Sequence, residues 1–150
     1  MKKNYLWKII LPLIFSIAVL GLIGFSQEAD AASVTITDQT SCETIPGAVW
    51  STSPDTCTVT TDQTIANGET WTVNPGVRLL LNTYYVDITV DNGGTIKNFG
   101  LLRNLGTINN SGTIDNPGTI DNGMVGTINN EDTINNSGSI DNGYGGASFS

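Results

Sequence analysis

A short repeat, G-T-I-x-N-x, runs through residues 94–143 and constrains the fold more than any other feature of the chain. Eight copies follow one another, seven of six residues and one with two extra residues, Met124 and Val125. The third position is always aliphatic, the fifth is always Asn, and the first is Gly in every copy except at Asp132. A fixed short period of this kind indicates an architecture of stacked, similar units.

The repeat has the alternation of a β-strand. Residues two apart in a strand point to the same side, so we expect the aliphatic residue and the Asn to face inward and Thr and x to face outward. Gly and Asn at this density oppose a helix and tolerate corner dihedrals. The sequence therefore predicts an all-β fold, a single-stranded parallel β-helix or β-solenoid. The predicted solenoid core is Ile96, Leu102, Ile108, Ile114, Ile120, Ile128, Ile134 and Ile140.

The recurring Asn needs hydrogen-bond partners if it is buried. Stacked Asn side chains can supply partners to one another in a ladder along the axis. The structural interpretation of these residues as a ladder is therefore preferred to a chemical role. The predicted Asn ladder is Asn98, Asn104, Asn110, Asn116, Asn122, Asn130, Asn136 and Asn142.

The outward x positions indicate three units, about 18 residues, per turn. In that arrangement Lys97 lies beside Asp115 and Arg103 lies beside Asp121, and each such pair is worth up to about 1 kcal/mol. Two units per turn would form only one of these pairs. Against three units, Asp141 would lie beside Asp121 and repel it.

The first 31 residues are typical of an export signal. Three lysines occur within the first eight residues, an apolar run covers 9–25, and Ala29-Asp30-Ala31 is a small-x-small cleavage site. An uncleaved membrane anchor is the alternative, because the run only just reaches spanning length. Both interpretations place the rest of the chain outside the cytoplasm, either secreted or at the cell surface.

Residues 32–61 are expected to form an N-terminal cap with a disulfide. Cys42 and Cys57 are the two cysteines of the chain, and in an exported protein such a pair predicts a disulfide. Closing this loop contributes about 3 kcal/mol in the chain-entropy model. A zinc or redox site is disfavoured, because the chain has no His and the spacing is not C-x-x-C.

The remaining boundaries follow from composition. Residues 62–143 are assigned to the solenoid, with a lead-in rich in large residues before the regular repeat. Residues 144–150 are expected to be a flexible tail that leaves the C-terminal end of the solenoid open. Trp50 and Trp71 are expected to cap the other, apolar end. The alternative is that Trp50, Trp71, Tyr84 and Tyr85 form an exposed glycan-binding surface.

Composition argues against catalysis and against several partners. Without His and with paired cysteines, neither a Ser-His nor a Cys-His arrangement can form. From Ala32 onward three cations stand against 12 carboxylates, a formal charge of −9, which argues against nucleic acid and anionic membrane surfaces. We therefore expect no enzyme and no cofactor. Asp121 and Asp141 are weak candidates for calcium, because the nonapeptide of calcium-binding rolls is missing.

The repeat, preceded by I-x-x-G-x-x-W-x-V-x-P-G-V-x-L over residues 65–79, resembles the β-solenoid regions of bacterial and archaeal surface proteins, including haemagglutinin-like adhesins. The resemblance covers residues 62–143 and implies an extracellular or cell-surface protein with a β-helical stalk or adhesive surface. The six-residue period is also similar to the left-handed β-helix of hexapeptide acyltransferases, whose chemistry uses a His that this chain lacks.

These observations lead to two functional expectations. The first is a non-catalytic surface or matrix protein, adhesin-like, that acts through its solenoid surface or by end-to-end assembly, with copies of itself or a larger surface protein as partners. The second is an extracellular carbohydrate-binding module. A membrane partner is expected only if the N-terminal segment is uncleaved.

Overall fold

A computed structural model describes residues 33–143 and 148–150, which belong to one compact unit spanning residues 31–150. The predicted signal peptide over 1–31 and residues 144–147 of the predicted tail lie outside the described residues. Within the described ranges, no helix has the length and apolar character needed to cross a membrane.

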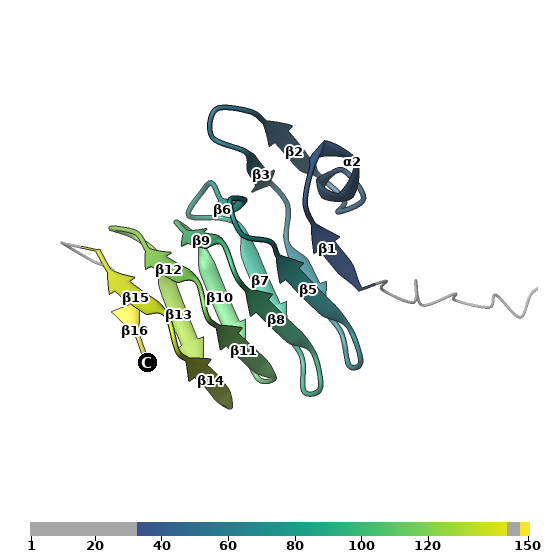
Figure 1. The fold of residues 1–150 in the computed structure, drawn as a ribbon. Coiled ribbons are helices and arrows are strands. Elements are labelled where there is room, and N and C mark those ends of the chain that lie inside the picture. The colour runs from purple at the N-terminus through teal and green to yellow at the C-terminus, as the bar shows by residue number, and fades with distance from the viewer. Residues whose placement is uncertain (1–32, 144–147) are drawn as a thin grey trace, which may run out of the picture. The chain divides into compact units, whose positions relative to one another are not determined.

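Three sheets wind around one hydrophobic core (Figure 1). All strand pairs in them are parallel except β2 with β3, which are antiparallel. Sheet A consists, in spatial order, of β1 (Val34–Ile36), β5 (Thr70–Val73), β8 (Thr95–Asn98), β11 (Thr113–Asn116) and β14 (Thr133–Asn136). Sheet B consists of β2 (Ala48–Ser51), β3 (Thr56–Val59), β6 (Arg78–Leu81), β9 (Leu101–Asn104), β12 (Thr119–Asn122) and β15 (Ser139–Asn142). Sheet C consists of β4 (Gln63–Ile65), β7 (Asp87–Val90), β10 (Thr107–Asn110), β13 (Thr127–Asn130) and β16 (Ser148–Phe149).

Successive strands enter successive sheets, so three repeat units make one turn. Thr95 of β8 pairs with Thr113 of β11, and the two are 18 residues apart. Thr107 of β10 pairs with Thr127 of β13, and here the separation is 20 residues. The two-residue insertion accounts for the difference, because it lies exposed in the corner between β12 and β13. The prediction of a β-solenoid with about 18 residues per turn is confirmed.

The strands of the repeat alternate between inward and outward side chains. From β9 to β12 the second and fourth residues are buried and the first and third are half-exposed. The second is aliphatic and the fourth is Asn, which is the predicted pattern. Each fully buried aliphatic side chain contributes about 1.5–3 kcal/mol. The repeat residues with completely buried aliphatic side chains are Ile96, Leu102, Ile108, Ile114, Ile120 and Ile128.

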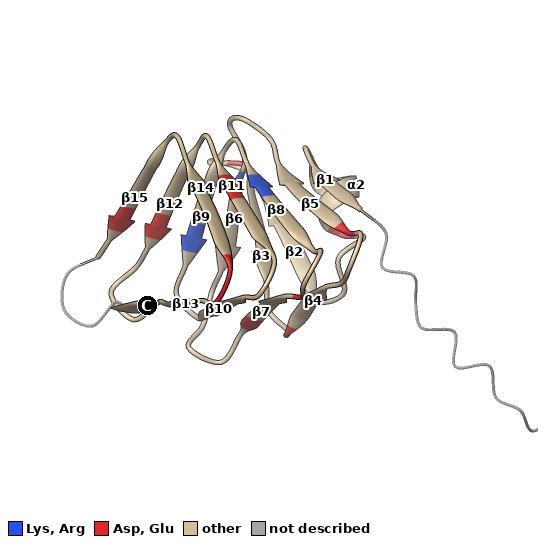
Figure 2. Ribbon diagram, turned by 90° about the horizontal axis from the view of Figure 1, so that it is seen from below, with Lys and Arg blue, Asp and Glu red and all other residues tan. Residues whose placement is uncertain are grey.

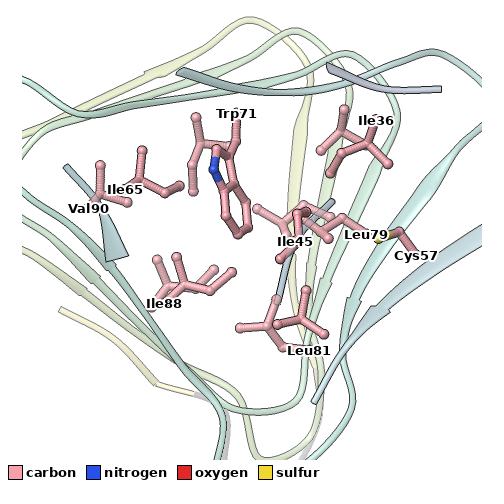
Figure 3. Packing of buried hydrophobic residues seen from close by; sticks show 14 of the residues in the cluster. Ile36, Ile45, Cys57, Ile65, Trp71, Leu79, Leu81, Ile88 and Val90 are labelled. Carbon is pink, nitrogen blue, oxygen red and sulfur yellow. The ribbon is translucent and has the colours of Figure 1, made fainter. Parts of the chain in front are cut away.

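Larger apolar residues fill the first turns of the coil. Figure 3 shows Trp71 pointing into the centre of the solenoid, among Ile36, Ile65 and Ile45. Trp71 is 4% exposed, and it pairs in register with Val34 of β1. These turns therefore enclose a more apolar core than the repeat, where each strand supplies one aliphatic residue and one Asn.

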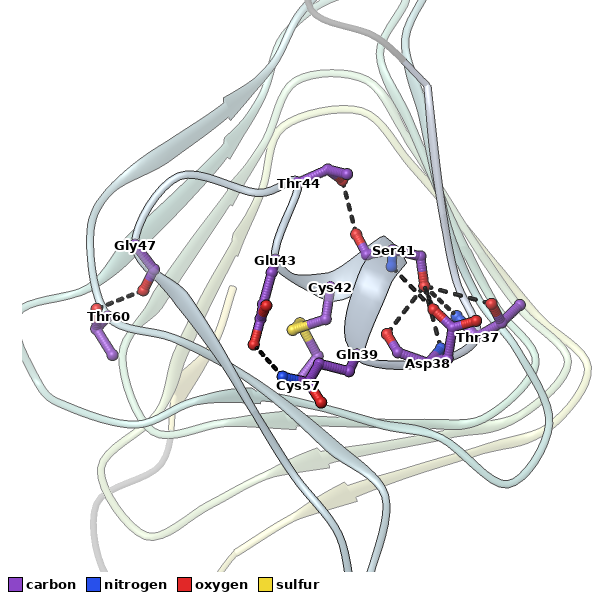
Figure 4. Close-up of a disulfide and its surroundings, with 10 residues drawn as sticks. All are labelled: Thr37, Asp38, Gln39, Ser41, Cys42, Glu43, Thr44, Gly47, Cys57 and Thr60. Atoms are coloured by element: carbon purple, nitrogen blue, oxygen red, sulfur yellow. Dashed lines mark hydrogen bonds between the residues drawn. A yellow bond between two sulfur atoms is a disulfide. The ribbon is translucent and has the colours of Figure 1, made fainter.

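A short helix closes the N-terminal end of the coil (Figure 4). Helix α2 (Gln39–Cys42) begins at the N-cap Asp38, whose carboxylate accepts a hydrogen bond from the Ser41 backbone amide at 2.9 Å. That backbone bond and the Ser41 hydroxyl lower the pKa of Asp38. Cys42 of the helix and Ile45 beyond it are buried in the core. At this end Trp50 of β2 also packs against the core and Trp71 lies inside it, so α2 and Ile45 add to the two tryptophans that were expected to cap the coil.

The predicted disulfide between Cys42 and Cys57 is confirmed, with a Cα–Cα distance of 5.6 Å. It ties α2 to β3, and β3 lies in sheet B between β2 and β6. The closing helix is therefore bonded covalently to the wall of the solenoid. A disulfide is typical of a protein that folds in an oxidising compartment.

Two predicted boundaries differ from the structure. The cap over 32–61 also contributes to the coil, because β1 and β3 pair in parallel with β5 and β6. The expected flexible tail over 144–150 is wrong for its end, since Ser148 and Phe149 form β16 and pair with β13. In both places the sequence departs from G-T-I-x-N-x, but the edge of the neighbouring strand in the sheet still offers backbone partners.

The repeat needs Gly at its first position because the backbone of the neighbouring turn lies too close for a Cβ atom, and not because of the backbone dihedral angles. The described glycines with positive φ all precede the repeat: Gly47 lies in the cap, and Gly68, Gly76 and Gly93 lie in the lead-in. A Cβ at Gly118 would collide with the backbone carbonyl of Gly100 in the turn before, and one at Gly100 would collide with the carbonyl of Val77. The first repeat position is therefore Gly because consecutive corners stack backbone on backbone.

Deleting Met124 and Val125 should leave the fold intact. The deletion restores the regular sequence GTIDNG-GTINNE and matches the two-residue corner of the preceding turn at Leu105–Gly106. We expect the melting temperature, measured by circular dichroism, to change by a few degrees at most. Deleting Ser111 and Gly112 is the matched control; it removes an entire corner and should abolish the cooperative transition. Equal losses in both variants would contradict the assignment of the insertion to a looped-out corner.

Candidate assembly surface

The Asn side chains of the repeat form three columns, one along each sheet. In sheet A, Asn98 Nδ2 donates to Asn116 Oδ1 at 2.7 Å, and Asn116 Nδ2 donates to Asn136 Oδ1 at 2.6 Å. The corresponding bonds in the other sheets are Asn104 to Asn122 at 2.8 Å, Asn122 to Asn142 at 2.7 Å and Asn110 to Asn130 at 2.6 Å. All eight residues of the predicted ladder lie in these columns.

Each donating amide also bonds to a backbone carbonyl of the following turn. The Asn98 amide reaches Thr119 O at 2.8 Å, and the Asn116 amide reaches Ser139 O at 2.9 Å. The amides of Asn104, Asn110 and Asn122 do the same to Thr127 O, Thr133 O and Ser148 O. A carbonyl can only accept, so these contacts fix the nitrogen of each side chain on the C-terminal side. The ladders are polar: their donors point toward the C-terminal end.

At the start of the sheet A column the ladder is incomplete. Asn98 Oδ1 is buried and has no hydrogen-bond partner in the structure. The residue beside Asn98 on the preceding strand is Val73, which has no donor to offer. In sheet B, by contrast, Asn104 Oδ1 accepts a bond from the Gly106 amide at 3.0 Å. The acceptor end of the sheet A ladder is thus closed off inside the molecule.

The other end of the coil is exposed. Its last turn consists of β14, β15 and β16, the edge strands of the three sheets. Ile134 and Ile140 in this turn are only partly buried, and Phe149 is 43% exposed. The residues beside them in the preceding turn, Ile114, Ile120 and Ile128, are fully buried. We call the described residues of β14, β15 and β16 the C-terminal rung.

Near the C-terminal rung two ladder amides donate to backbone carbonyls two residues further along the chain, in the corner that follows their own strand. Asn136 Nδ2 donates to Gly138 O at 3.3 Å, and Asn130 Nδ2 donates to Asp132 O at 2.9 Å. In the interior each such amide instead bonds to two acceptors on the next turn. The sequence predicted the ladder positions but could not give their direction, because Asn has a donor and an acceptor of nearly equal size.

The four aromatic residues predicted to bind glycans do not form one surface. Trp71 is in the core, and Trp50 is half-buried and packs against it. Tyr84 and Tyr85 are 67% and 87% exposed in the corner between β6 and β7. Their rings are 6.5 Å apart at an interplanar angle of 68°, an edge-to-face pair.

Figure 2 marks the charged residues along the ribbon; Glu69 is buried, whereas the charged residues of the repeat strands occupy half-exposed or exposed positions. Arg103 of β9 and Asp121 of β12 form an ion pair at 3.4 Å, and both are partly exposed, so its contribution is about 0–1 kcal/mol. Lys97 lies in register with Asp115, which accepts a hydrogen bond from Asn135 at 2.8 Å. These are the neighbours that three units per turn predicts.

The weak calcium candidates Asp121 and Asp141 lie in register on neighbouring strands, β12 and β15. Within residues 33–143 and 148–150, no three His, Cys, Asp or Glu side chains gather closely enough to hold a metal ion. Two outward carboxylates are far fewer ligands than the six to eight oxygens that calcium takes. This pair carries no argument for a metal site.

Comparisons of the chain with protein-family models, with curated proteins and with solved structures find no match. The class that the described residues define is a β-solenoid with a disulfide near its N-terminal end.

Replacing the buried Asn116 by Ala should destabilise the protein far more than replacing the exposed Asn135 by Ala. Asn116 is fully buried and takes part in three ladder bonds, and each buried group that loses its partner costs about 1–3 kcal/mol. We expect N116A to lower the free energy of unfolding in urea by about 2–4 kcal/mol. N135A, which removes one exposed bond from the adjacent strand β14, should cost less than about 1 kcal/mol. Similar losses in the two variants would show that the ladder is energetically unimportant.

Proposed function

We propose that this chain is a non-catalytic structural component of a cell surface or extracellular matrix, adhesin-like in character, which joins another component end to end through its C-terminal rung. The observation that carries the proposal is the difference between the two ends. The N-terminal end is closed by α2 and a disulfide, whereas in the C-terminal rung Ile134 and Ile140 are only partly buried and Phe149 is exposed.

The exposed end has the two properties of an association surface. A solenoid turn contacts only its neighbours, so apolar residues of a last turn that no described residue covers are in contact with water. Edge strands also present unpaired backbone groups that can pair with another chain. The N-terminal end of the same chain does cover its apolar core: helix α2 lies over that end, and the Cys42–Cys57 disulfide bonds the helix to β3.

An extracellular location is supported by three independent features. They are the predicted signal peptide over 1–31, the Cys42–Cys57 disulfide, and the resemblance of residues 62–143 to the solenoids of surface proteins. The outward positions of the repeat strands are mainly Thr, Asn, Ser and Asp, and these polar residues are compatible with a solenoid surface in contact with water. A scaffold role requires no concave site and no titrating group.

Replacing Ile134 by Lys should release the protein from the cell surface or matrix of the organism that makes it. The variant places a charge on the inward side of β14, in the proposed contact. We expect I134K in the medium and the wild-type chain in the surface fraction, as measured by immunoblotting of the two fractions.

The matched control is N135K, which places the same charge one residue away on the outward side of β14, beside Asp115. It should remain in the surface fraction, and both variants should show a cooperative melting transition. Equal release of I134K and N135K, or a wild-type chain that is entirely in the medium, would contradict assembly through the C-terminal rung.

The second candidate function is carbohydrate binding, and the exposed Tyr84–Tyr85 pair favours it. Exposed aromatic rings offer flat apolar faces beside polar hydroxyls, which suits a sugar ring. On this alternative the solenoid is a carrier for the corner between β6 and β7, and the C-terminal rung plays no part.

The double variant Y84A/Y85A tests this alternative on a glycan array. If the tyrosines bind sugar, glycans retained by the wild-type chain should be lost in the double variant. F99A is the control, because Phe99 is 47% exposed in a different corner, between β8 and β9. An array without hits for the wild-type chain, or hits that survive in Y84A/Y85A, would remove carbohydrate binding as a function of this pair.

A further inference from the structure

We infer that the C-terminal rung accepts a parallel β-solenoid turn from another chain, one that presents hydrogen-bond acceptors at the ladder positions, and that it does not accept either end of a second copy of this protein. The inference rests on the proposed function and identifies the partner by its chemistry. The direction of the Asn ladders carries the argument.

Every ladder bond runs the same way along the coil. The donating amide always belongs to the earlier turn, and its two acceptors are the Asn Oδ1 and a backbone carbonyl of the later turn. In the last turn of sheet A, Asn136 accepts from Asn116 through its Oδ1, and its amide nitrogen donates to Gly138 O at a long 3.3 Å, so one of its two N–H groups has no ladder partner. A turn added beyond β14 would therefore meet a donor, and it must bring an acceptor.

This direction disfavours the pairing of two C-terminal rungs. Such a pair would be related by a two-fold axis, so each rung would offer the other the same surface. Amide donors would face amide donors, and their acceptors would still be held by the preceding turns. Glu131, Asp132 and Asp141 are exposed at or near this end, so the two copies would also bring like charges together.

Stacking of the C-terminal rung on the N-terminal end of a second copy is also disfavoured. Helix α2 and the antiparallel strand β2 occupy that end. The one unpaired acceptor of the ladder there, Asn98 Oδ1, is buried behind Val73 and cannot be reached. The edge strands of sheets A and C at that end, β1 and β4, contain no Asn, so they lack the side-chain acceptors that the rung requires.

A foreign parallel turn satisfies each requirement at once. Strands in register with β14 and β15 would place aliphatic residues over Ile134 and Ile140, as Ile114 and Ile120 do from the other side. An Asn at the fourth strand position would accept a hydrogen bond from Asn136 through its Oδ1, and its own amide would be free to donate to a further turn. The partner chemistry is therefore a strand of the type T-I-x-N with its backbone parallel to β14.

The experiment measures binding of a fluorescent peptide by the full chain. The peptide copies residues 113–130, one complete turn of the ladder with strands β11, β12 and β13. The test variant is Asn136→Asp, which keeps an acceptor for Asn116 and replaces the outward donor by an acceptor. We expect the dissociation constant, measured by fluorescence anisotropy, to rise about tenfold or more when these donor bonds are lost.

The matched control is Ser137→Asp, which adds the same charge at the next residue, an exposed position that follows β14. Its affinity should stay within about twofold of the wild-type value, because exposed charges contribute little. A peptide with Leu in place of the Asn residues at 116, 122 and 130 should also bind at least about tenfold more weakly, although it is more apolar. Simple apolar burial predicts the opposite sign for that peptide.

Three results would overturn the inference: no peptide binding by the wild-type chain, equal affinity of N136D and S137D, or tighter binding of the Leu peptide. So would a dimer of the full chain, seen by sedimentation velocity, that disappears in I134K. If I134K loses binding but N136D binds normally, the C-terminal rung is still the assembly surface. In that case the Asn ladder does not determine which partner binds, and only the further inference fails. The surface-retention measurement decides the proposed function independently.

Discussion

The structure depends on one interaction, the hydrogen bond from a buried Asn amide to the turn that follows it. Burying an amide without partners costs more than an aliphatic neighbour returns, so each Asn requires another turn in register. The Asn98 amide, for example, is satisfied only because Asn116 and Thr119 are both present in the next turn. Because the same requirement recurs in three sheets, the ladders fix the register of the coil as well as contributing to its stability.

This requirement also explains how the two halves of the coil differ. The first turns hold Trp71, Leu79 and other large residues, and they are stabilised by apolar burial and a disulfide. The later turns hold one aliphatic residue and one Asn per strand, so their core depends on polar contacts between turns. The change occurs where Val73 lies beside Asn98, and the cost is one unpaired buried oxygen.

A polar ladder gives a solenoid two chemically different ends, even where its sequence is periodic. In sheet A the acceptor end is buried beside Val73, while the last donor of that column, Asn136, lies in the C-terminal rung. Apolar exposure alone would make such an end adhesive toward many surfaces. Directed amides restrict it to partners that supply acceptors at a fixed spacing, and this is how a structural protein can be selective without a pocket.

The sequence by itself determined the β-solenoid, the inward Ile and Asn positions, three units per turn and the disulfide, because alternation, period and cysteine count are local or counting properties. The tertiary structure alone decided four other features. The direction of the ladders depends on backbone carbonyls of the next turn, such as Thr119 O. The glycines are needed because corners stack, not because of their own dihedrals. Trp71 is enclosed by β1 and Ile45, whereas Tyr84 and Tyr85 are exposed, and composition cannot separate these cases. Finally, β16 forms although its sequence does not match the repeat, because the edge of β13 supplies backbone partners that no local pattern records.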